Sequence, residues 1–271
     1  MTASHSPTRP LLDRAGAQAH RLVCGTGLAS LVAYRLDPNR AVEVLAHGLT
    51  QDGTLVVGLV EGFLPEASHE VRLDVRREAD EAQVRITAAS LHLLGVLHWL
   101  TPEESERLLD DSRLPETMSL LAGAPGVRWA RVATERLVLH DASGVTPFDY
   151  QRAIVERAVF PAIAQELAAH DIVSRVGESA LRAICQAVVA GTLPGVVQSD
   201  RPSASSCGHA VDRIFCVDVD GVGVNLMQVG RERTSVVFVP FPAQVGDLDS
   251  LAVQVTALAD LARADGRRQR G

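Results

Sequence analysis

Lysine is missing from this chain. All 26 of its Lys and Arg positions are arginine. The absence excludes a Schiff-base lysine, the lysine of a phosphate-binding loop and a catalytic lysine base. Several large classes of enzyme are therefore excluded before any motif is considered.

Cysteine is scarce and follows no binding pattern. The four cysteines are Cys24, Cys185, Cys207 and Cys216, and they form neither a C-x-x-C pair nor a zinc-finger spacing. Because a chain of this length can build a core without disulfides, we expect reduced and mostly buried thiols. That usage is typical of a cytoplasmic protein.

Long apolar runs and concentrated positive charge are also lacking. No stretch reaches the roughly 18 apolar residues of a membrane span, and no charged-then-apolar signal segment precedes the first helix. The net charge of −7 and the pI near 5.7 argue against nucleic acid as a partner. Apolar residues make up 46% of the chain and charged residues 22%, which is typical of a folded globular protein. We expect a soluble, cytoplasmic protein that binds neither membrane nor nucleic acid.

The first half of the chain has the pattern of a small antiparallel barrel. A short amphipathic helix is expected over residues 11–24, ended by Gly25. Thr101-Pro102-Glu103-Glu104 is a capping box with proline at the first helical position, which predicts a helix start. Alternating apolar residues and turn signals such as Gln51-Asp52-Gly53 predict strands at residues 28–35, 42–49, 54–60, 71–75, 84–86, 90–100 and 127–140. We assign residues 11–145 to this barrel domain.

The second half has the pattern of an α+β domain over residues 146–265. A helix start is expected at Thr146-Pro147, with helices continuing to about residue 170 and over residues 176–189. Residues 192–210 are rich in Gly, Pro, Ser and Asp and predict a mobile loop, so we expect proteases to cut first near Arg201 or Arg213. A three-stranded antiparallel meander over 211–242 and a last helix over about 247–263 complete the domain.

Several motifs have a plain structural explanation. Residues 25–30 form part of a dinucleotide fingerprint but follow a helix, so a helix cap explains the glycines better. His92 and His98 point to one side of the same strand roughly 20 Å apart, too far to share a metal. His47 is expected to bind a backbone partner in a half-buried strand.

Cys207 and His209 could together bind a transition metal or haem iron.

The C-terminal domain resembles that of the HugZ-like haem-utilisation proteins. The resemblance lies in a domain-closing strand, the motif F-P-x-x-V at Phe241–Val245, an acidic cap and a helix that ends in Leu261-Ala262-Arg263. Residues 136–144 resemble the segment that closes the barrel of that family. The resemblance implies an α+β fold, with an FMN-binding-type split β-barrel related to pyridoxamine-phosphate oxidases followed by a helix-plus-meander domain. It also implies a homodimer that binds haem between the barrel and the C-terminal domain.

The resemblance implies particular site residues. The family has an H-hydrophobic-N-x-D-H motif on the first helix of its C-terminal domain, and His170 is the one imidazole of this chain in the matching region. His170 is thus the expected iron ligand, with His209 as its competitor. Arg128, Arg131 and Arg136 are candidates to pair with the haem propionates.

Three functions stay open at this point. The first is a haem-binding protein that could also degrade haem with an external electron donor, as some family members do. The second is a non-catalytic regulator that binds a protein of the tetrapyrrole pathway, as a related plant member does. The third is an oxidoreductase that uses FMN or a deazaflavin.

Overall fold

The computed structural model describes residues 8–81, 84–109, 114–154, 160–203 and 210–268. The chain forms two compact units: residues 1–77 with 89–157, and residues 78–88 with 158–271. The second unit is therefore assembled from two separate pieces of the chain, because residues 78–88 belong to it. None of the described helices is both long and apolar enough to cross a membrane.

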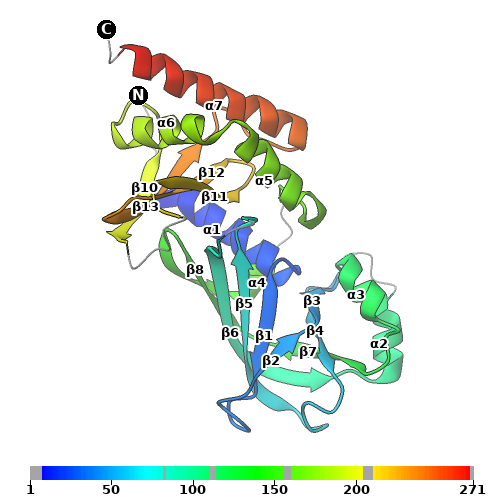
Figure 1. Ribbon diagram of the computed structural model, residues 1–271. Helices are drawn as coiled ribbons and strands as arrows, with labels where there is room; N and C mark the ends of the chain where they lie inside the picture. The colour runs from blue at the N-terminus through cyan, green and yellow to red at the C-terminus, as the bar shows by residue number, and fades with distance from the viewer. Residues whose placement is uncertain (1–7, 82–83, 110–113, 155–159, 204–209, 269–271) are drawn as a thin grey trace, which may run out of the picture. The chain divides into compact units, whose positions relative to one another are not determined.

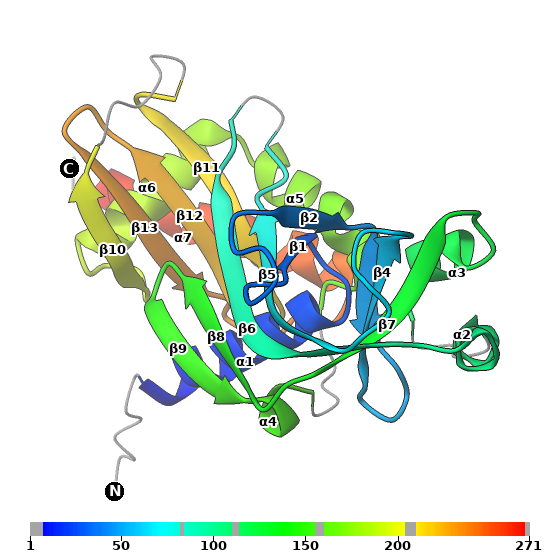
Figure 2. The ribbon, with the colours of Figure 1, turned by 90° about the horizontal axis from the view of Figure 1, so that it is seen from below.

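The first unit is built around an antiparallel sheet (Figure 2). Its strands are β1 (Leu28–Val32), β2 (Ala41–Val44), β3 (Ala46–Leu49), β4 (Leu55–Val60), β5 (His69–Glu78), β6 (Thr87–Trp99), β7 (Val127–Ala133), β8 (Arg136–Asp141) and β9 (Gly144–Asp149). Its helices are α1 (Thr8–Val23), α2 (Pro102–Leu109), α3 (Glu116–Leu121) and α4 (Tyr150–Ile154).

The long strand β6 divides this sheet. Residues 90–93 of β6 pair with β8, whereas residues 96–99 pair with β7. The strands then run β2-β1-β5-β6-β7-β4-β3 along one path, with β8 and β9 branching from β6. This division, together with the helices at the margins of the sheet, confirms the expected α+β class with a split barrel.

Alternation along the strands explains the core of the first unit. In β5, Val71, Leu73 and Val75 are buried while the residues between them face outward. Leu22 of α1 and Leu91 of β6 are fully buried in the same cluster. The apolar stripe of α1 therefore covers the inner face of the sheet.

The capping box at the start of α2 is confirmed. The backbone N–H of Thr101 donates to Glu104 Oε2 at 2.8 Å, and the N–H of Glu104 donates to Thr101 Oγ1 at 3.2 Å. The turn before β4 is also as expected, since Gly53 has φ +81° and its N–H donates to Thr50 O at 2.9 Å.

The second unit is a four-stranded antiparallel sheet covered on one face by helices (Figure 1). The strands are β10 (Val196–Pro202), β11 (Arg213–Val219), β12 (Gly223–Val229) and β13 (Arg233–Pro240), in the order β10-β13-β12-β11. A short 3₁₀ turn, η1 (Ile163–Gln165), leads to α5 (Glu166–Arg175), α6 (Glu178–Val189) and α7 (Leu248–Arg268). Ile184, Leu226, Val237 and Leu251 are among the buried residues between the sheet and the helices.

Two expectations about local structure are wrong. Thr146 and Pro147 lie in β9, and the helix begins only at Tyr150. Proline is tolerated there because β9 is an edge strand, and Pro147 lies opposite Val138 of β8. Composition alone read Thr-Pro as a helix start.

The expected loop over 192–210 contains a strand instead. Residues 196–202 pair with β13 as β10, so the meander has a fourth strand and Arg201 lies inside a paired segment. β10 is an exposed edge strand, which needs few apolar side chains, so its polar composition imitated a loop. Residues 204–209, including Cys207 and His209, lie outside the described residues.

Candidate functional site

An exposed imidazole on the outer side of the first unit is held by a carboxylate. Asp74 of β5 and His92 of β6 are both half-buried, and His92 Nδ1 lies 2.6 Å from Asp74 Oδ1. Arg72 Nε donates to the other carboxylate oxygen of Asp74 at 2.9 Å. Because an ionised carboxylate only accepts, a neutral His92 ring donates its Nδ1–H to Asp74 and has its lone pair on Nε2.

A second imidazole stands beside the first. On the paired strands, Ser90 lies opposite His140 and His92 lies opposite Val138, so both histidines project from one face of the sheet. The rings of His92 and His140 meet edge to face, with centroids 5.0 Å apart. We call Asp74, His92 and His140 the histidine face.

Exposed apolar side chains and arginines surround the histidine face. Leu94 follows two residues after His92 and is 60% exposed, and Val145, opposite His140 on β9, is 63% exposed. Arg76 projects from the same face of β5 as Asp74, and Arg136 projects from the same face of β8 as His140. Neither guanidinium forms an ion pair within the described part of the chain. The face thus combines a metal-ligating nitrogen, apolar surface and unpaired positive charge.

His170, the iron ligand expected from the resemblance, lies in the second unit. It is on α5, only 9% exposed, and its Nε2 is 3.3 Å from Oε1 of Glu81, at the end of the strand pair β5–β6. The hydrogen bond to Glu81, aided by the charges of Asp80 and Asp171, raises the pKa of His170 above its ordinary value, although burial opposes this. The structure therefore holds His170 in an ion pair that favours the protonated ring.

The three expected propionate partners do not converge. The guanidinium of Arg128 lies over the ring of Trp99, 4.6 Å from its centroid, and contacts Glu66 at 3.4 Å. Arg131 lies on the same strand, β7, and lines a cavity that is described below. Arg136 lies on β8 beside the histidine face. His209, the other expected ligand, is outside the described residues.

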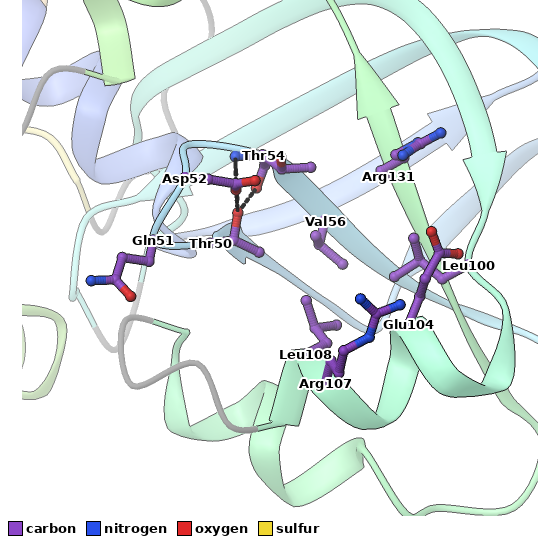
Figure 3. A pocket seen from close by; sticks show the side chains of 10 residues that line it. All are labelled: Thr50, Gln51, Asp52, Thr54, Val56, Leu100, Glu104, Arg107, Leu108 and Arg131. Carbon is purple, nitrogen blue, oxygen red and sulfur yellow. Dashed lines mark hydrogen bonds between the residues drawn. The ribbon is translucent and has the colours of Figure 1, made fainter.

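Arg131 lines an open cavity of about 360 Å³ in the first unit (Figure 3). Its lining residues come from the β3–β4 turn, β4, the end of β6, α2 and β7: Thr50, Gln51, Asp52, Thr54, Val56, Leu100, Glu104, Arg107, Leu108 and Arg131. We call this cavity the arginine hollow. Hydroxyls and guanidiniums gather here although no Arg–Ser/Thr cluster stands out in residues 28–85, because both arginines come from later in the chain.

The other histidines of the described residues have partners within the chain, such as His69, whose Nε2 lies 3.1 Å from Pro65 O. The Nε2 of His47 lies 2.7 Å from Leu22 O, which confirms the expected backbone partner, but β3 is fully buried and not half-buried as expected. His98 Nδ1 contacts Ser68 Oγ at 2.8 Å. His20 Nε2 lies 3.5 Å from the Sγ of Cys24, which directly follows α1. Among the described residues, no group of three or more His, Cys, Asp or Glu side chains could hold a metal ion by itself.

The Asp74–His92 pair is the main site feature that the sequence interpretation missed. Both residues lie at outward-facing positions of strands whose inner faces are apolar, so the alternation in the sequence predicts that each side chain points outward. Their contact was not predicted, because it depends on which strands are neighbours and in which register.

Comparison with known proteins assigns no family to the chain. No family model matches the chain, and no curated protein matches it. Among solved structures, a haem-binding protein from Mycobacterium smegmatis is 14% identical, covers 92% of this chain and 98% of its own, and has a TM-score of 0.49.

Two further structures are similar at lower scores. A protein of unknown function from Agrobacterium tumefaciens is 15% identical, covers 96% of this chain and 99% of its own, and has a TM-score of 0.37. ChuZ from Campylobacter jejuni is 8% identical, covers 56% of this chain and 63% of its own, and has a TM-score of 0.34. The site itself must therefore carry any statement about function.

Proposed function

We propose that this protein binds haem on the histidine face, with His92 as the iron ligand. The observation that carries the proposal is the 2.6 Å contact between His92 Nδ1 and Asp74 Oδ1. Metal-ligating histidines commonly donate their other ring N–H to a carboxylate, which fixes the tautomer and raises the basicity of the ligating nitrogen. Bound haem would supply the iron chemistry, and the chain would supply the axial imidazole.

The surroundings of His92 suit a flat amphipathic ligand. A porphyrin needs apolar surface beneath it, which exposed Leu94 and Val145 offer. Its propionates need cations at the rim, and Arg76 and Arg136 are unpaired within the described residues. Guanidinium forks bind carboxylates in a bidentate manner, so these two arginines would fix the orientation of the ligand.

His92 is a better candidate for the iron ligand than His170, because its carboxylate partner occupies a different ring nitrogen. The carboxylate holds Nδ1 of His92 and leaves Nε2 for a ligand, and the side chain is 40% exposed. In His170 the carboxylate engages Nε2, and the side chain is 11% exposed. Ligation by His170 or His209 remains a prediction from the family resemblance, which the same experiment tests.

Titration of the purified protein with haemin tests the proposal. We expect a shifted Soret band in the wild type, a weaker or displaced band in His92→Ala and a smaller change in Asp74→Asn. His98→Ala is the matched control, because His98 lies on the same strand and bonds to Ser68. Wild-type binding by His92→Ala would overturn the assignment, and its loss in His170→Ala or His209→Ala would move the ligand to that residue.

The same sample separates binding from degradation. Loss of the Soret band in the presence of oxygen and an external reductant would extend the proposal to haem degradation. A wild type that shows no Soret shift would remove the haem proposal and leave the regulator or the flavin-dependent oxidoreductase, of which a yellow protein as purified would indicate the second.

A further inference from the structure

The arginine hollow has an apolar floor and a polar rim. Val56 and Leu108 are buried, and Leu100 is half-buried, so the floor is apolar. The rim carries two threonines from the β3–β4 turn and two arginines, Arg107 from α2 and Arg131 from β7. A concave site with an apolar base and a few polar groups is the usual form of a small-molecule site.

The two carboxylates of the rim are engaged by the chain itself. The hydroxyl of Thr50 donates to Asp52 Oδ1, and the N–H of Thr54 donates to the same oxygen at 3.2 Å. The hydrogen bonds from the side chains of Thr50 and Thr54 lower the pKa of Asp52. Glu104 accepts the N–H of Thr101 as part of the capping box. Neither acid neutralises an arginine of the hollow through an ion pair between described residues.

Neither arginine is paired with a carboxylate that lines the hollow, although Glu103, one turn earlier on α2, is an electrostatic neighbour of Arg107. Arg107 Nε donates to Glu103 O at 3.1 Å, and Figure 3 shows its guanidinium reaching from α2 toward the middle of the hollow. Arg131 forms neither a hydrogen bond nor an ion pair from its side chain within the described residues. Both arginines are exposed at the rim of the hollow, where their charges lie beside an apolar floor and can pair with the anionic group of a bound ligand.

We propose that the arginine hollow binds a small ligand with an apolar body and one phosphate or carboxylate group. The anionic group is held by Arg107 and Arg131, and the body lies on Val56, Leu100 and Leu108. A cavity of about 360 Å³ fits a ligand of one ring and a short substituent. The proposal does not depend on haem binding, since no histidine lines the hollow.

Calorimetric titration of the full chain with phenyl phosphate, benzoate and inorganic phosphate tests this. We expect phenyl phosphate or benzoate to bind more tightly than inorganic phosphate, because only they cover the floor. Arg131→Gln and Arg107→Gln should each weaken binding about tenfold or more, since each removes a charge-assisted contact.

Arg128→Gln is the matched control. It removes the same charge from the same strand, but Arg128 is stacked on Trp99 and does not line the hollow. We expect its affinity to equal that of the wild type. Equal weakening by all three substitutions would show non-specific attraction and overturn the proposal, as would inorganic phosphate binding as tightly as phenyl phosphate. Comparing phenyl phosphate with benzoate shows which anionic group the hollow prefers.

Discussion

At the scale of single residues, two buried histidines have opposite electrostatic environments. His47 has a backbone carbonyl as its partner, and burial lowers its pKa despite that hydrogen bond. His170 has the carboxylate of Glu81, which raises its pKa. Burial thus outweighs a neutral acceptor, whereas an ionised acceptor outweighs burial.

We predict that the ring protons of these two histidines titrate on opposite sides of the ordinary value of 6.5. NMR should show His170 titrating above it and His47 below it. Since the folded pKa of His170 is raised, its stabilising effect is fully present below pH 6.5 and is lost as the pH rises through the folded pKa. For His47 the folded pKa is lowered, so stability falls as the pH decreases below 6.5.

The Glu81→Gln variant tests whether the carboxylate of Glu81 raises the pKa of His170. It keeps the shape of the side chain but removes the charge, so the His170 midpoint should fall while that of His47 stays in place. An unchanged His170 midpoint would contradict the role given to Glu81.

The sequence predicts the hydrogen-bond partner of His47 but not that of His170. For His47, its place in a strand before the Asp-Gly turn was enough to predict a backbone partner. His170 was singled out by a family motif, and nothing near it in sequence indicates Glu81, which lies 89 residues away. Contacts at that separation depend on tertiary structure and are not visible in local patterns.

At the scale of elements, β4 and β7 approach closely at one glycine. Gly58 lies opposite Trp129, and a Cβ at position 58 would lie 2.7 Å from Cζ3 of the indole. The indole is buried, at 3% exposed, in a cluster with Ala46, Val56 and Met118. The flat ring therefore occupies the space that a side chain at position 58 would need.

We predict that Gly58→Ala lowers the free energy of unfolding by roughly 1–3 kcal/mol, because the added methyl overpacks this contact. Tryptophan emission during denaturant unfolding measures the change, since Trp129 reports directly. Gly123→Ala is the control, because a Cβ there meets nothing within 4 Å. Equal stability of the two variants would refute the close approach.

Elements with local signals were predicted well from the sequence. The helix before Gly25, the capped helix after Thr101 and the hairpin around Gly53 depend on chemistry within a few residues. The edge strands β9 and β10 were misread, because an edge strand tolerates proline and polar residues that are also typical of turns and helix starts. Their pairing partners, not their own composition, make them strands.

At the scale of the whole molecule, apolar surface of the first unit stays uncovered in a single chain. Leu28, Leu94 and Val145 are each at least 60% exposed on strands β1, β6 and β9. A large exposed apolar surface on a sheet with open edges is typical of an interface. A two-fold dimer is the commonest way to bury such a surface, and haem bound beside Leu94 and Val145 would then lie at the edge of the interface.

We predict that the protein is a homodimer with twice the mass of the 28.9 kDa chain at micromolar concentration. Val145→Arg should shift light scattering toward the single-chain mass, because it places a charge in the proposed interface. Val253→Arg on α7 is the matched control, since Val253 is 64% exposed, like Val145 at 63%. A wild type that scatters as a monomer would exclude the dimer.

The two-piece composition of the second unit has a consequence for inheritance. Residues 78–88 supply Val84 and Ile86 to a cluster with Phe215, and Glu81 to His170. A gene fragment that encodes only residues 158–271 would leave Phe215 without Val84 and Ile86, and His170 without the carboxylate of Glu81. A recombination event whose crossover falls between residues 88 and 158 therefore transfers an incomplete second unit, and residues 78–88 must be acquired together with it.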